Sequence, residues 1–133
     1  MSTIALRVPT RLPDRVLLAT GQCYILFEAG PISVRALIAE KVRAELRKAR
    51  AGGIAITSLP LLLATDLPIG LSPRDEQRAI LRAEELFSEC HYLLLHNGLP
   101  LVDLDEQVVL TRQSSVQFLV VPSAVPLERE VGA

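Results

Sequence analysis

Residues 30–38 read Gly30-Pro31-Ile32-Ser33-Val34-Arg35-Ala36-Leu37-Ile38, and within this stretch an extended segment passes into a helix. Residues 23–27 before it are an aromatic and β-branched run, typical of a strand, which Gly30-Pro31 closes. Ser33 is a preferred residue for capping a helix, and an apolar stripe with helical spacing begins directly after it. The stretch therefore predicts a strand followed at once by a helix.

The predicted helix is amphipathic and ends at Gly52-Gly53. Its apolar stripe consists of Val34, Leu37, Ile38, Val42 and Leu46. Its other face is charged and is expected to lie in solvent: Arg35, Glu40, Lys41, Arg43, Glu45 and Arg47. Basic residues gather near its end: Arg43, Arg47, Lys48 and Arg50. Two interpretations of them remain open: cations favoured by the helix dipole, or a docking patch for an acidic partner.

Two segments upstream compete for the first strand of a hairpin with residues 23–27. One is Thr3–Val8, which shows partial alternation and stops at Pro9. The other is Arg15–Ala19, which precedes the turn signal Thr20-Gly21-Gln22. The sequence predicts the hairpin and leaves the choice between the two open.

A second helix is predicted to start at Ser72-Pro73, with Ser72 as the cap and Asp75 and Glu76 in the first turn. Its apolar positions are Ala79, Ile80, Ala83, Leu86, Phe87 and Cys90. Residues 54–71 before it are apolar but interrupted by prolines, and we expect a buried or half-buried loop there.

Short strands and turns follow the second helix. Residues 92–95 are an apolar run, and Asn97-Gly98 fits a type I′ hairpin turn. Further runs are expected at 99–102, 108–110 and 116–121, with an acidic corner at 103–106. Residues 122–133 form a polar, proline-containing tail.

Composition narrows the function classes. The chain has 133 residues, of which 50% are hydrophobic and 22% charged, as in an ordinary globular domain. The formal net charge is -1 with no Trp, so we expect no nucleic-acid binding. The apolar stretch at 54–71 is broken by Pro60, Asp66 and Pro68, so no membrane span is expected. Two well-separated cysteines and no secretion signal favour a cytoplasmic protein.

This order of elements resembles the β-grasp, or ubiquitin-like, fold, an α+β fold with a mixed sheet. The segments that carry the resemblance are 30–38, 92–98, 103–111 and 116–121. They look like bacterial ubiquitin-like proteins that have a long helix and a helical insertion before the penultimate strands. The resemblance implies a domain over residues 1–121 with an insertion at 51–91, followed by a flexible tail at 122–133.

The resemblance also implies a protein modifier rather than an enzyme, with no cofactor and no metal. Its partners would be activating-type, conjugating-type and peptidase-type proteins encoded beside it. Activation would adenylate a C-terminal carboxylate and pass the acyl group to a thiol, and the implied site residues are Val131, Gly132 and Ala133. Either a peptidase removes Ala133 and exposes the carboxylate of Gly132, or the intact Gly132-Ala133 end is itself the acyl donor. The rival hypothesis is a non-conjugated interaction adaptor or assembly subunit.

Two other groups of residues were considered as sites. Cys90-His91 could suggest a nucleophile, but Cys90 shares the apolar stripe of the second helix, which predicts a buried structural thiol. His91, His96, Asp103 and Asp105 could suggest a metal site, but they lack ligand spacing. We expect a solvated acidic corner at 103–106 instead.

Overall fold

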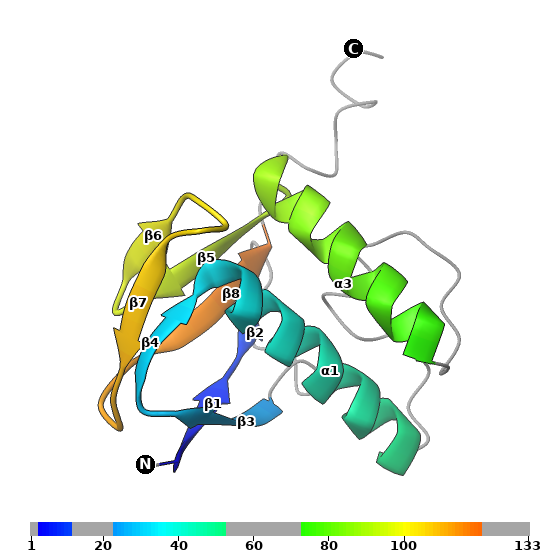
Figure 1. Cartoon of the computed structure of the whole chain (residues 1–133), viewed down its shortest axis with the longest axis horizontal. Coiled ribbons are helices and arrows are strands. Elements are labelled where there is room, and N and C mark those ends of the chain that lie inside the picture. The colour runs from blue at the N-terminus through cyan, green and yellow to red at the C-terminus, as the bar shows by residue number, and fades with distance from the viewer. Residues whose placement is uncertain (1–2, 12–22, 53–72, 121–133) are drawn as a thin grey trace.

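The computed structural model describes residues 3–11, 23–52 and 73–120, with the elements shown in Figure 1. The helices are α1 (Val34–Gly52) and α3 (Pro73–Ser88). The strands are β1 (Thr3–Val8), β2 (Thr10–Arg11), β3 (Cys23–Glu28), β4 (Gly30–Ser33), β5 (Tyr92–His96), β6 (Leu99–Leu101), β7 (Gln107–Leu110) and β8 (Val116–Val120). This is an α+β fold, as predicted. Several predictions lie outside the described residues: the strand at 15–19, the loop at 54–71, the Ser72 cap and the tail at 122–133.

The hairpin is formed by β1 and β3. The two strands pair antiparallel from Thr3 opposite Glu28 to Val8 opposite Cys23. Alternate residues of β1 are buried, which gives the strand one core face and one outer face. Residues 3–8 therefore form the strand that pairs with residues 23–28, which decides the choice that the sequence left open.

The start of α1 is held by its own cap and by a distant loop. The Ser33 hydroxyl accepts a hydrogen bond from the Ala36 amide at 3.1 Å, as the sequence predicts for a cap. The Val34 amide donates to the Glu106 carbonyl and the Arg35 amide to the Leu104 carbonyl, both at 2.9 Å. The loop between β6 and β7 thus pairs amides that have no partner within the helix. It also carries the acidic corner, whose charge suits the positive end of the helix dipole.

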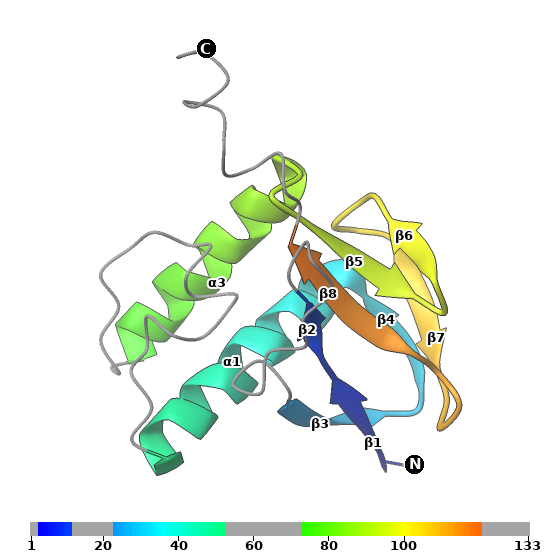
Figure 2. The ribbon, with the colours of Figure 1, turned by 180° about the vertical axis from the view of Figure 1, so that it is seen from behind.

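Strand β8 lies in the interior of a four-stranded sheet, between β2 and β5 (Figure 2). It runs parallel to β2, with Thr10 opposite Phe118, and antiparallel to β5. The β5–β6 hairpin turns at Asn97 and Gly98, which have φ angles of 52° and 83°. Two positive φ angles are what a type I′ turn requires, so the predicted turn is confirmed.

The core lies between these strands and the two helices. In Figures 1 and 2, α1 crosses one face of the strands and α3 runs beside it. The predicted apolar stripe of α1 is buried throughout, and so are Ala79, Ile80, Ala83, Leu86 and Phe87 of α3. In the strands the central core residues are Ile4, Leu6, Ile25, Phe27, Leu94, Leu110 and Phe118. No helix in the described part of the chain is long and apolar enough to cross a membrane.

One prediction for α1 is wrong. Lys41 and Glu45 were expected in solvent, but the side chains of both are 0% exposed. The Lys41 ammonium donates to the Val8 carbonyl at 3.0 Å and lies 5.7 Å from the centre of the Phe118 ring. It is also 3.6 Å from Glu45 Oε2. These two positions of the charged face are interior because strands cover one side of α1 while α3 packs against another.

Candidate functional site

The tail residues predicted as the site, Val131, Gly132 and Ala133, lie outside the described residues. The structure describes the strand that leads into the tail. Val120, the last described residue of β8, pairs with Tyr92 at the start of β5. Because Tyr92 follows shortly after α3 in the chain, the described part ends close to the C-terminal end of that helix.

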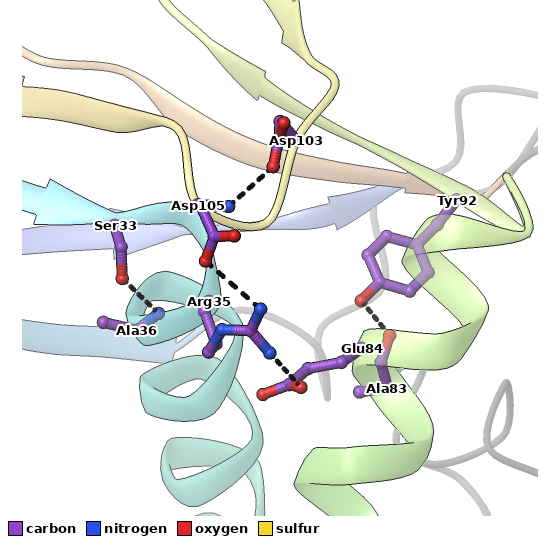
Figure 3. A network of polar contacts seen from close by, with 8 residues as sticks. All are labelled: Ser33, Arg35, Ala36, Ala83, Glu84, Tyr92, Asp103 and Asp105. Atoms are coloured by element: carbon purple, nitrogen blue, oxygen red, sulfur yellow. Dashed lines mark hydrogen bonds and ion pairs between the residues drawn. The ribbon is translucent and has the colours of Figure 1, made fainter.

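Tyr92 fixes β5 and β8 to α3 at this point (Figure 3). Its hydroxyl donates to the Ala83 carbonyl of α3 at 2.7 Å. Its ring lies 6.1 Å from the ring of Phe87 and 5.6 Å from that of Phe118, measured between centroids. Burial raises the pKa of Tyr92, and the charges of Glu45 and Glu84 add to the shift. The neutral phenol is therefore built into the core.

The turn after α3 corrects the prediction for Cys90. The Cys90 amide donates to the Phe87 carbonyl at 3.0 Å and the His91 amide to the Leu86 carbonyl at 2.9 Å, which is a Schellman arrangement. Cys90 has a φ of 63° and is exposed, so the predicted buried thiol is wrong. The helix ends at Ser88, and the left-handed backbone at Cys90 takes the side chain off the apolar stripe.

Strands β3, β5 and β8 each have an inner and an outer face. On β3, the side chains of Tyr24 and Leu26 are 73% and 68% exposed. On β5 and β8, Leu94 and Phe118 are buried, while Leu93, Leu95 and Leu119 are half-buried on the opposite face. The apolar runs of β5 and β8 therefore each have one inner and one outer face. The outer face is apolar enough to take part in protein contacts.

Arg35 connects three parts of the molecule near the same end of α3 (Figure 3). Its guanidinium donates to Glu84 of α3 at 2.8 Å and to Asp105 of the acidic corner at 3.2 Å. The hydrogen bond to Asp105 and then the charge of Glu84 raise the pKa of Arg35 above its already high ordinary value. Asp103 in turn accepts a hydrogen bond from the Asp105 amide at 2.9 Å. The acidic corner is thus tied to both helices, which the sequence did not predict.

The residues considered as metal ligands are two histidines and two aspartates. His91 lies 3.4 Å from Glu89, beside the turn that follows α3. His96 ends β5, with its backbone opposite Leu99 and Val116. Within residues 3–11, 23–52 and 73–120, no group of three or more His, Cys, Asp or Glu side chains is placed to hold a metal ion. The side chain of Asp105 is 84% exposed, which agrees with a solvated corner.

Comparison with known proteins gives no relative: no family model, no curated protein and no solved structure matches this chain.

Proposed function

We propose that this chain is a β-grasp protein that serves as a ubiquitin-like modifier. In this proposal, partner enzymes of the activating and conjugating types activate its C-terminal tail and transfer it to a target. Residues 1–121 are the recognition domain. The acyl donor is either the carboxylate of Gly132, exposed when a peptidase removes Ala133, or the intact Gly132-Ala133 end. The protein is a substrate of the reaction and not its catalyst.

The observation that carries the proposal is the place of β8 in the sheet. Strand β2, which follows β1 after Pro9 alone, pairs parallel with β8, and β8 pairs antiparallel with β5. With the β1–β3 hairpin and α1 across the strands, this arrangement supports a β-grasp fold. It also supports a modifier, because an interior strand gives a rigid base to the segment that follows it.

The chemistry would take place on the tail. The C-terminal carboxylate attacks the α-phosphate of ATP, which forms an acyl adenylate and releases pyrophosphate. A partner's thiolate then attacks the acyl carbon and displaces AMP, which leaves a thioester. A glycine at the acyl position has no Cβ, so its backbone can approach closely in a narrow channel. Gly132 meets this requirement once Ala133 is removed.

The test uses three forms of the chain, each with an N-terminal affinity tag, expressed in the cells that encode it. They are the full chain, a chain without Ala133, and a chain without Gly132 and Ala133. Purification under denaturing conditions and mass spectrometry should find covalent adducts of the first two forms and none of the third. Adducts of all three forms, or of none, would contradict the proposal.

A second function, a non-conjugated adaptor, is favoured by the exposed apolar side chains of β3. Tyr24 and Leu26 lie on the outer face of the hairpin, where an interaction module would offer contact area. An adaptor would keep non-covalent partners in all three forms. Replacing both residues by Ser should release those partners, while adducts would still be absent.

A further inference from the structure

A shallow groove lies between α3 and the loop that joins β6 to β7. It has a volume of about 420 Å³, and its lining residues are Leu81, Glu84, Glu85, Ser88, Glu89 and Leu104. Leu81, Glu84, Glu85 and Ser88 come from α3, and Glu89 follows it directly. Positions 81, 84, 85 and 88 form one stripe on the helix surface, and Leu104 supplies the facing wall. The floor is mostly hydrocarbon although half of the lining residues are acidic.

The groove has an apolar centre, formed by Leu81 and Leu104, and acidic edges. The Leu81 side chain is 51% exposed, whereas the other apolar residues of α3 named above belong to the core. Leu104 packs against that core and is half-buried. An exposed leucine on a helix next to a second leucine across a groove is the pattern of a helix-in-groove contact. One large apolar side chain of a partner would fill the space between them.

The charge of the rim selects the chemistry of that partner. Glu84 is paired with Arg35 at 2.8 Å, and its side chain is only 12% exposed. The side chains of Glu85 and Glu89, one helical turn apart, are 61% and 54% exposed. Arg82 contacts Glu85 at 2.8 Å, and His91 lies 3.4 Å from Glu89. Among the described residues, three carboxylates line the groove, and the guanidinium groups of Arg35 and Arg82 contact two of them.

We propose that this groove docks a basic amphipathic helix of a partner protein. A leucine-like side chain of that helix inserts between Leu81 and Leu104, and two Lys or Arg residues one turn apart face Glu85 and Glu89. The docking surface is formed by α3, Glu89 and Leu104 and includes none of the tail residues used in the chemistry proposed above. It would bring a partner to the side of the domain formed by the two helices.

The probe is a synthetic fluorescent helical peptide with leucines on one stripe and lysines one turn apart along its edge. Binding to the full chain is measured by fluorescence anisotropy at low ionic strength. Two control peptides are used, one of the same composition in scrambled order and one with Glu in place of Lys. The designed peptide should bind at least about tenfold more tightly than either control, and added salt should weaken it.

Two variants introduce a lysine at different positions of α3. Leu81→Lys puts a cation into the groove and should weaken the peptide at least about tenfold. Gln77→Lys puts it on an exposed position of α3 outside the groove and should change binding by about twofold or less. Glu85→Lys with Glu89→Lys should reverse the preference, so that the Glu-containing peptide binds better than the Lys-containing one. Circular dichroism checks that each variant is folded.

Several results would overturn the proposal. These are no binding of the designed peptide up to about 1 mM, equal binding of the scrambled peptide, or equal effects of Leu81→Lys and Gln77→Lys. Self-association of the chain that Leu81→Lys abolishes, with no peptide binding, would assign the groove to a second copy instead. Because none of these measurements involves the tail, failure here leaves the proposed modifier function to its own test.

Discussion

Replacing Lys41 by Met should destabilise the protein strongly, because this lysine is the charged centre of a buried contact. Its ammonium donates to the Val8 carbonyl at 3.0 Å and lies 3.6 Å from Glu45 Oε2, and both side chains are 0% exposed. Met fills a similar volume but offers neither a donor nor a charge. The Val8 carbonyl then loses its ammonium, and the Glu45 carboxylate stays in the core beside an uncharged side chain.

The size of the effect follows from this geometry. Removing one member of a buried ion pair costs about 3–5 kcal/mol, because the remaining charge keeps its desolvation penalty. A domain of this size has a free energy of unfolding of about 5–15 kcal/mol. The Lys41→Met variant should therefore remain folded but be only marginally stable. Combining it with Glu45→Leu removes the remaining charge. The double variant should be more stable than Lys41→Met alone.

The assay is urea unfolding of the wild type, both single variants and the double variant, followed by circular dichroism. Arg43→Met is the matched control, because it removes a cation from the same helix at a side chain that is 39% exposed. It should cost about 1 kcal/mol or less. A cost for Lys41→Met as small as that of Arg43→Met would refute the reasoning. So would strict additivity of Lys41→Met and Glu45→Leu.

Three further predictions concern single residues. Burial raises the pKa of Tyr92, so the phenol ionises first in the unfolded state. The free energy of unfolding should therefore fall above about pH 10 by about 1.4 kcal/mol per pH unit. Urea melts at several pH values should show this dependence for Tyr24→Phe but not for Tyr92→Phe. Gly98→Ala should lower the free energy of unfolding by about 1–2 kcal/mol. A Cβ at this position has space, but the φ of 83° is strained for alanine. An unchanged free energy of unfolding would refute the assigned turn. Cys90→Gly should raise the free energy of unfolding by about 0.5–1 kcal/mol by relieving a φ of 63°, while Cys90→Ala should leave it unchanged.

Elements that depend on local signals were predictable from the sequence. Ser33 gave the start of α1, because a cap and an apolar stripe meet there, and Asn97-Gly98 gave the β5–β6 turn. Pro73 with Asp75 and Glu76 gave the start of α3. Each of these signals acts within one turn of its own chain, so no tertiary partner was needed to recognise it.

Features that depend on tertiary contacts were not predictable. The burial of Lys41 goes with its contacts to Val8 of β1 and Phe118 of β8, and nothing near Lys41 in the sequence indicates that strands cover this side of α1. Arg35 bonds to partners 49 and 70 positions away, which leave no local pattern. Cys90 continued the helical spacing of α3, and no glycine marked the left-handed residue at which the stripe ends. The tail residues predicted as the site lie beyond the described part.

The parallel pairing of β2 with β8 has a consequence for synthesis of the chain. Thr10 and Phe118 are opposite each other in the sheet although roughly a hundred residues separate them along the chain. On the ribosome, the hairpin and α1 emerge first. Strands β2 and β5 can pair with β8 only after β8 has also emerged. The interior of the sheet closes only after β8 has emerged, and until then two strand edges remain open to wrong partners.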